Sequence, residues 1–302
     1  FAGIPIAVSV TETSKLLTPV LHSVKDLLSL LAHPAMPKAV GYQLLQQSAN
    51  AKCINIARCL RPQFCLPFAE EFDEQILNTL QVLLGKELSD PQIRQCKFPF
   101  SKGGLGLRPL ASISHAAFVG AAAGIAPLWT SVLGEDWRNL CPLYVDSVME
   151  AVTALRPKLN PRDFSDLFQP DDPNSFWDFF NSAEGLKLLQ DAKGGLQGIL
   201  TSLIEGKELD YFKGTLSPGD RSRLNSSSQK FASEWLRSSK SNTQLANSQF
   251  VTAILLRLGS PGESDSDPAL ALYDNSVAPV LKDLRSKFLE EVIAMWALRA
   301  GA

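Results

Sequence analysis

Apolar residues recur at steps of three and four positions through the first third of the chain, and this spacing constrains the fold most. The first stretch carries them at Leu16, Leu17, Val20, Leu21, Val24, Leu27, Leu28 and Leu31. Residues at this spacing line one face of an α-helix. Stretches at about 37–60 and 67–84 continue the pattern, with Pro62 between them and Gly85 after the last. Three consecutive amphipathic helices with short connections predict an antiparallel bundle.

Elements on either side of this bundle complete the expected architecture. A β-branched run at 3–10 (GIPIAVSV) predicts a short strand, and helical spacing returns at 110–155, 183–206 and 277–300, the last after an acidic loop at 260–267. Segment 156–182 contains four prolines and six aromatic residues, and predicts an irregular connector pinned to a core. We expect a mainly α chain with a thumb-like helical bundle and N-terminal strand over 1–110 and a second helical domain over 111–302.

The charge of the chain is nearly balanced but unevenly distributed. Its 302 residues are 45% apolar and 20% charged, values typical of a folded protein. A net charge of -2 excludes a uniformly basic protein that binds nucleic acid by bulk charge. Residues 1–110 nevertheless hold 11 Lys and Arg and 8 Asp and Glu, a net +3, which leaves −5 for the remainder. The first third therefore retains the charge for a local basic surface.

Cysteine usage and hydropathy narrow the cellular setting. Five cysteines without a C-x-x-C pair argue against a disulfide scaffold or zinc knuckle and favour a reducing intracellular compartment, with nucleus and organelle not distinguished. The sequence begins at Phe1 without a secretory signal pattern. Residues 109–134 lack charged side chains, yet Ala and Gly dominate and Pro127 interrupts them. A buried helix is therefore favoured over a membrane span. We also expect no metal and no cofactor.

Catalytic constellations are sparse. Only His22, His33 and His115 could serve as the base of a Ser/His/Asp hydrolase, and none lies near a G-x-S-x-G turn. The acidic cluster at 70–74 lies in the first turn of its expected helix, where negative charge offsets the helix dipole. We expect no catalytic residues, and an unrelated helical enzyme with an unrecognised site ranks last among the hypotheses.

Basic residues form the candidate nucleic-acid-binding set: Lys38, Lys52, Arg58, Arg61, Lys97, Lys102 and Arg108. The first four lie along the second expected helix, and the others surround a glycine-rich turn, Gly103, Gly104 and Gly106. That turn lacks the G-x-x-x-x-G-K-[ST] pattern of a phosphate loop, so we interpret it as a tight structural turn. Composition alone favours an ordinary solvated surface for these charges, although a handful of cations on one face suffices to bind phosphates.

Two ordered blocks carry a family resemblance. The first, within 1–125, includes PFAEEFDEQILNTLQVLLG, SDPQIRQCKFPFSKGGLGLRPL and SHAAFVGAAA, and the second, at 232–259, ends in LLRLG. They resemble segments just downstream of the polymerase palm in reverse transcriptases of eukaryotic non-LTR retrotransposons. The residues that fit the first phrase of that family are Phe72, Asp73, Leu84, Gly85, Leu88, Ser89, Asp90, Gln95, Pro99, Gly103, Gly104, Leu105, Gly106, Leu107, Arg108, Ala116, Ala117, Phe118 and Val119.

The resemblance implies a thumb and post-thumb region. GIPI would be the strand adjoining the palm, and the next three helices would grip a primer–template duplex, with Lys38, Lys52, Arg58 and Arg61 as phosphate contacts. The palm aspartates, on a [FY]-x-D-D turn, should precede GIPI and are absent from this sequence. Without two carboxylates to hold Mg²⁺, the chain cannot activate a 3′-hydroxyl. No Cys/His knuckle follows the second block, which is a further departure from many family members.

The expected function is therefore non-catalytic binding of RNA or of a ribonucleoprotein through a basic, thumb-like surface. A purely structural helical subunit of a large complex, for instance an organellar one, is the alternative from a different class, favoured by pI ≈ 6.0 and the acidic remainder. Its partners would be other protein subunits. A fragment of an active RNA-directed DNA polymerase, with its palm upstream of Phe1, is the third hypothesis.

Overall fold

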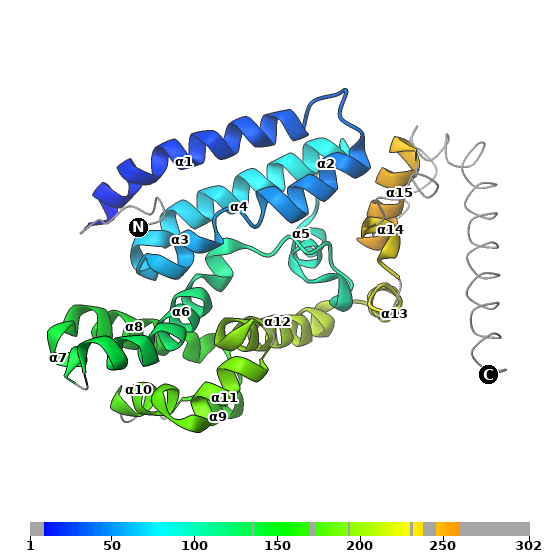
Figure 1. Ribbon diagram of the computed structural model, residues 1–302. Helices are drawn as coiled ribbons and strands as arrows, with labels where there is room; N and C mark the ends of the chain where they lie inside the picture. Colours follow the sequence, from blue (N-terminus) through cyan, green and yellow to red (C-terminus); the bar gives the residue numbers. More distant parts are fainter. Residues whose placement is uncertain are drawn as a thin grey trace, which may run out of the picture.

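The computed structural model describes residues 9–134, 136–168, 173–192, 194–229, 232–237 and 246–259, and every regular element within these ranges is helical (Figure 1). The mainly α class is thus confirmed. The N-terminal strand expected at 3–10 is not supported. Residues 3–8 lie outside the described ranges, and Ser9 caps the first helix by accepting a hydrogen bond from the Glu12 amide at 3.2 Å. That side-chain cap favours helix at this point because it satisfies a free amide of the first turn.

The helical elements share short connections and follow one another in the order α1 (Val10–Leu31), α2 (Lys38–Leu44), η1 (Leu45–Ala49), α3 (Ile54–Cys59), α4 (Pro62–Leu84), α5 (Asp90–Lys97), η2 (Phe100–Lys102), α6 (Leu110–Leu133), α7 (Trp137–Leu140), α8 (Pro142–Leu155), η3 (Arg156–Lys158), α9 (Pro161–Leu167), α10 (Pro173–Asn181), α11 (Ala183–Asp191), α12 (Gly195–Thr215), α13 (Pro218–Ser227), α14 (Glu234–Arg237) and α15 (Asn247–Arg257). Here η1 is a π-helical turn, and η2 and η3 are 3₁₀ turns.

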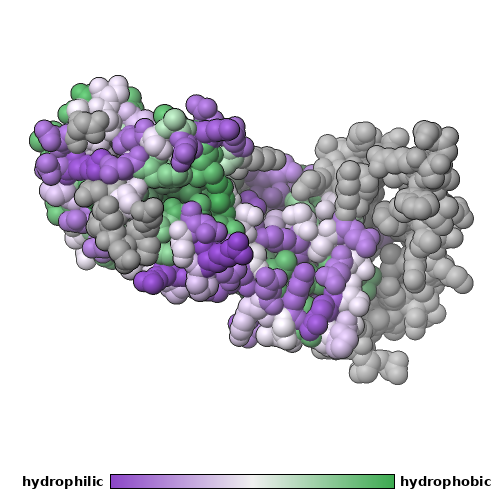
Figure 2. Space-filling view, turned by 90° about the horizontal axis from the view of Figure 1, so that it is seen from below, coloured by the Kyte–Doolittle hydropathy of each residue, from purple (hydrophilic) through white to green (hydrophobic). Residues whose placement is uncertain are grey.

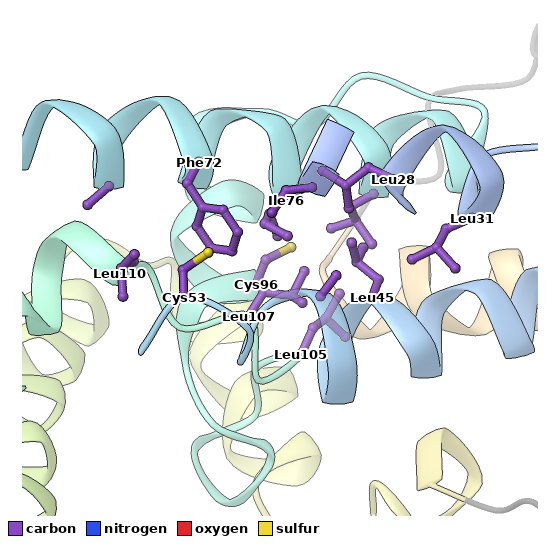
Figure 3. Packing of buried hydrophobic residues seen from close by; sticks show 14 of the residues in the cluster. Leu28, Leu31, Leu45, Cys53, Phe72, Ile76, Cys96, Leu105, Leu107 and Leu110 are labelled. Atoms are coloured by element: carbon purple, nitrogen blue, oxygen red, sulfur yellow. The ribbon is translucent and has the colours of Figure 1, made fainter. Parts of the chain in front are cut away.

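The first apolar core lies between α1, α4 and the segments that pack beneath them. α1 runs along α4 and buries the predicted face at Leu17, Leu21, Val24, Leu28 and Leu31. Figure 3 shows Phe72 and Ile76 of α4 pointing toward Cys53, Cys96 and Leu107, which come from three different segments. Burying apolar side chains on this scale is the main favourable contribution to folding.

The second and third expected helices differ from the prediction in their boundaries. The single helix expected over 37–60 is broken into α2, η1 and α3, because the Asn50 amide bonds to the Leu45 carbonyl in a wide π turn before a non-helical turn at 50–53. α4 begins at Pro62, five positions before the expected Pro67, which lies inside it. Gly85 ends α4 in the left-handed conformation (φ 66°), as predicted.

A second apolar core surrounds α6, which packs against α3, α4, α8 and α12. Aromatic side chains from the proline-rich segment fill it, including Phe164, Phe168 and Phe176, so the prediction that they pin this segment to a core is confirmed. Trp137 and Trp177 are fully buried there with ring centroids 5.0 Å apart. The segment itself is not irregular, because η3, α9 and α10 make it mostly helical.

α6 is the one helix in the described part of the chain with the length and hydropathy of a membrane span. Its small residues instead allow close packing: a Cβ added at Gly120 would lie 2.6 Å from the Gln197 Cβ of α12. Phe118, Val119 and Ala122 of the same helix are fully buried. The first half of α6 is therefore packed as a core helix, whereas Leu128, Val132 and Leu133 near its C-terminal end are exposed.

The C-terminal helices return to the first core. Leu236 of α14 and Phe250, Ile254 and Leu258 in or beside α15 belong to the same cluster as α1 and α4. That cluster therefore draws residues from both sides of the boundary expected at residue 110, and the division into 1–110 and 111–302 stays a prediction. The expected loop at 260–267 and helix at 277–300 lie outside the described residues.

Candidate nucleic-acid interface

The glycine-rich turn folds back on the end of α5. Gly103 (φ 83°) and Gly106 (φ 70°) adopt left-handed backbone conformations that side chains disfavour. Gly104 is required by space, since a Cβ there would lie 2.0 Å from the Phe98 carbonyl oxygen. The Gly106 amide donates to that same oxygen at 2.8 Å. The turn is thus a packed structural element, in agreement with the interpretation of its sequence.

α15 holds this turn from the other side. Arg257 is buried, and its guanidinium donates to the carbonyls of Gly104 (3.2 Å) and Phe100 (3.3 Å). Its own carbonyl accepts from the Gln95 side-chain amide at 2.8 Å and from the Arg223 guanidinium. Burial lowers the pKa of Arg257 to about 10. The two sequence blocks that carry the family resemblance are therefore in direct contact, with Arg257 as the link.

Two of the predicted basic residues converge on α12. Arg108 Nε lies 2.6 Å from Glu205 Oε1, and Lys102 Nζ lies 3.7 Å from Glu205 Oε2. Glu205 is buried, so this carboxylate stays in place and offsets part of their charge. Burial lowers the pKa of Lys102, against the opposing effect of Glu205. The pair retains a net positive charge at the edge of the helix.

Arg58 reaches the same helix, whereas the remaining predicted cations of the second helical stretch lie on other elements. Arg58 Nε donates to Gln197 Oε1 on α12 at 2.9 Å. Lys52 Nζ donates to Ser23 Oγ on α1, and the Arg61 guanidinium lies 5.9 Å from the centre of the Phe64 ring. The backbone of Lys38 donates to Asn247 Oδ1 of α15.

Lys97 lines a cavity that the remaining predicted residues do not reach. The cavity has a volume of about 510 Å³. Its walls come from α5, α6, η3 and α12, which are distant in sequence, and are formed by Arg94, Lys97, Phe98, Ser112, Pro157, Lys158, Lys207, Glu208, Tyr211 and Phe212. Four cations thus face one carboxylate and three aromatic rings.

The four cations of the cavity (Arg94, Lys97, Lys158 and Lys207) are not neutralised by ion pairs. Within the described ranges, no carboxylate oxygen lies within 4.0 Å of their charged nitrogens. Desolvation raises the pKa of Glu208, while Lys97 and Lys158 act in the opposite direction. The cavity therefore carries an excess of positive charge, which favours anionic ligands.

Contacts to neighbouring groups fix several of these side chains. Lys207 Nζ donates to the carbonyls of Pro157 and Leu159, each at 2.9 Å. Lys158 Nζ lies 3.4 Å from Nδ1 of His115, whose pKa is lowered to about 4 by burial and by Lys158, so the imidazole is neutral at pH 7 and accepts from the ammonium. The walls of the cavity are preformed around these bonds.

Sequence reasoning missed three of the four cavity cations: Arg94, Lys158 and Lys207. Arg94 and Lys97 are three positions apart on α5, which is a helical signal for a shared face. Lys158 and Lys207 approach them only through the packing of η3 and α12, which no local pattern reveals.

Asp73, which belongs to the acidic cluster at 70–74, has a structural role. The Asp73 carboxylate accepts hydrogen bonds from the amides of Leu110 (2.7 Å) and Ala111 (2.9 Å), where it caps α6. Burial raises the pKa of the Cys65 thiol to about 12 and that of Cys53 to about 11, which suppresses the reactive thiolate. Within the described residues, no group of three His, Cys, Asp or Glu is placed to hold a metal ion.

Comparison with known proteins adds no relative: no family model, no curated protein and no solved structure matches this chain.

Proposed function

We propose that this chain is a catalytically inactive helical protein derived from a reverse transcriptase, and that it binds RNA or an RNA–protein assembly through a basic surface along α12. The observation that carries the proposal is the cavity lined by Arg94, Lys97, Lys158 and Lys207 without a compensating ion pair. Unneutralised cations close together are the feature that phosphate backbones recognise.

The distribution of charge along α12 supports a strand-like ligand. Arg58 contacts Gln197 near the start of the helix, Arg108 contacts Glu205 at its middle, and the cavity lies beside its second half at Lys207. At 1.5 Å per residue, the step from 197 to 207 corresponds to about 15 Å along the helix axis. A single-stranded RNA of a few nucleotides can span that length while its phosphates contact successive cations.

The test is binding of a fluorescently labelled single-stranded RNA of about 20 nucleotides, followed by anisotropy from about 50 to 200 mM salt. We expect the logarithm of the association constant to fall linearly with the logarithm of salt concentration. The double variant Arg94→Gln/Lys97→Gln removes two exposed, unpaired cations and should reduce both the affinity and the steepness of the salt dependence.

Lys15→Gln is the control for a change of net charge, because Lys15 is an exposed lysine on α1, which runs along the top of the molecule in Figure 1, away from α12. Its substitution changes the net charge by one without touching the proposed surface. Undetectable RNA binding, binding that does not respond to salt, or an equal loss in Lys15→Gln would contradict the proposal.

A second candidate function, a protein-interaction subunit, is favoured by exposed leucines and valine where α6, α7 and α8 meet. The exposed side chains are Leu128 (58%), Val132 (69%), Leu133 (45%), Leu140 (66%) and Leu143 (68%). Figure 2, seen from below, shows hydrophobic surface over the half of the molecule built from α6 to α11. Apolar side chains gathered in this way are typical of interaction sites. A soluble, monomeric, cooperatively folded isolated chain would argue against obligate assembly.

A further inference from the structure

We infer that the cavity between α5, α6, η3 and α12 binds a single nucleotide unit, with the phosphate on the lysines and the base against the Arg94–Tyr211 pair. This inference deepens the proposed RNA-binding function and rests on it for its biological ligand. It assigns a chemical class of ligand, a nucleoside monophosphate, to the cavity. Contacts to the phosphate backbone of RNA alone would not distinguish the bases.

The lysines supply the phosphate site. Lys207 uses two of its ammonium N–H groups on the carbonyls of Pro157 and Leu159, which leaves the third for a ligand. Lys97 is exposed and, in the described part of the chain, makes no ion pair. Lys158 Nζ lies beside them, 3.4 Å from Nδ1 of the neutral His115, and desolvation lowers its pKa against the opposing effect of Glu208. Several ammonium groups around one cavity match the doubly charged phosphate of a monophosphate.

The aromatic wall supplies the base site. The Arg94 guanidinium lies over the Tyr211 ring at 5.7 Å from its centroid, and Tyr211 is 66% exposed. A planar guanidinium and a phenol ring are the surfaces on which unpaired bases stack. Phe98 and Phe212, with ring centroids 5.6 Å apart, fix the floor behind them. Inorganic phosphate has no ring that could stack on this wall, whereas the base of a nucleotide would cover it.

The size and rigidity of the cavity suit such a ligand. Its volume of about 510 Å³ lies within the range of about 300 to 1,000 Å³ found for small-molecule sites. Ser112 of α6 adds one hydroxyl to the lining, which can bond to a ribose or base. The walls come from four elements already packed together, so binding requires no rearrangement of the fold.

The experiment is isothermal titration of the full chain with adenosine monophosphate, adenosine and inorganic phosphate, each up to about 10 mM. We expect the monophosphate to bind at least about tenfold more tightly than either fragment, because only it engages both walls. Tyr211→Ala should weaken monophosphate binding by about five- to hundredfold, the range for loss of one base stack, and leave phosphate binding unchanged. Lys97→Met should weaken both. Both side chains are exposed, and circular dichroism verifies that each variant folds.

The outcomes separate this inference from the proposed function. If single-stranded RNA binds with the expected salt dependence but adenosine monophosphate does not, the nucleotide site is refuted and RNA binding stands. If the monophosphate binds as expected but RNA does not, the site stands and the proposed function is refuted. Phosphate binding as tight as monophosphate binding, or a Tyr211→Ala variant with unchanged affinity, would refute the base site.

Discussion

The half-buried carboxylate that caps α6 predicts an unusual pH dependence of stability. Asp73 accepts two amide hydrogen bonds at the start of α6, yet burial raises its pKa from 3.8 to about 6. The two amides and Lys97 favour the carboxylate, and Glu70 opposes it, but desolvation is the largest effect. The variant Asp73→Asn tests this balance, because an amide is the uncharged isostere of a carboxylic acid.

The magnitude follows from the difference between the two pKa values. A pKa higher in the folded than in the unfolded state means that stability is greatest below about 4 and is lost as the pH rises through about 6. The shift from 3.8 to about 6 corresponds to about 3 kcal/mol when complete. Between pH 4.5 and 7.5, wild type should therefore lose about 2 kcal/mol relative to Asp73→Asn.

Urea denaturation followed by circular dichroism at four pH values measures this difference directly. Subtracting the variant from wild type cancels the titrating groups that do not interact with Asp73. Glu74→Gln is the control, since Glu74 is the exposed neighbour of Asp73 and should leave the wild-type pH profile in place. A wild-type-minus-variant difference that is flat between pH 4.5 and 7.5, or that rises with pH, would refute the reasoning.

Two further predictions concern the turn and the α12 surface. Gly104→Ala should lower the melting temperature more than Gly85→Ala, because a Cβ at position 104 would lie 2.0 Å from a carbonyl oxygen. A Cβ at position 85 has open space, so alanine there costs only about 1–2 kcal/mol for the left-handed conformation. Equal melting temperatures of the two variants would contradict this. Glu205→Gln removes the carboxylate that pairs with Lys102 and Arg108, so RNA affinity should rise and the salt dependence should steepen by about 0.7 per added phosphate contact; unchanged anisotropy titrations would contradict the role of these cations.

Local sequence patterns were sufficient for the mainly α class, for some helix faces and ends, and for the glycine-rich turn. The three- and four-residue spacing identified the buried face of α1, and Gly85 identified the end of α4. The π turn at Leu45–Ala49 was not predictable, because its register depends on how α2 and α3 pack beneath α4 rather than on a residue with a special backbone preference. The prolines at 157 and 161 suggested irregular structure, but each lies in the first turn of a helical element, where proline is tolerated.

The candidate site was predicted less completely than the fold. Lys97, Lys102 and Arg108 were identified by their position around the turn, and the structure places Lys97 in the cavity and the other two beside Glu205 of α12. The pairing of Lys102 and Arg108 with Glu205 could not be predicted, because about a hundred residues separate the partners along the chain. A cavity formed by four elements is a product of tertiary packing, so composition and local spacing do not predict it.

The attachment of α15 to the first core has a consequence for synthesis on the ribosome. Arg257 bonds to Gly104 across 153 positions of sequence. Phe250 and Ile254 complete a core whose other residues are mostly synthesised much earlier. At about 5–20 residues per second, the ribosome needs about 8 to 30 s to add the intervening chain. During that window the nascent helices expose apolar surface that nothing later in the chain can yet cover. A chaperone that binds nascent chains should therefore associate with this protein until residue 259 has emerged, and shortening the chain before α15 should prolong that association.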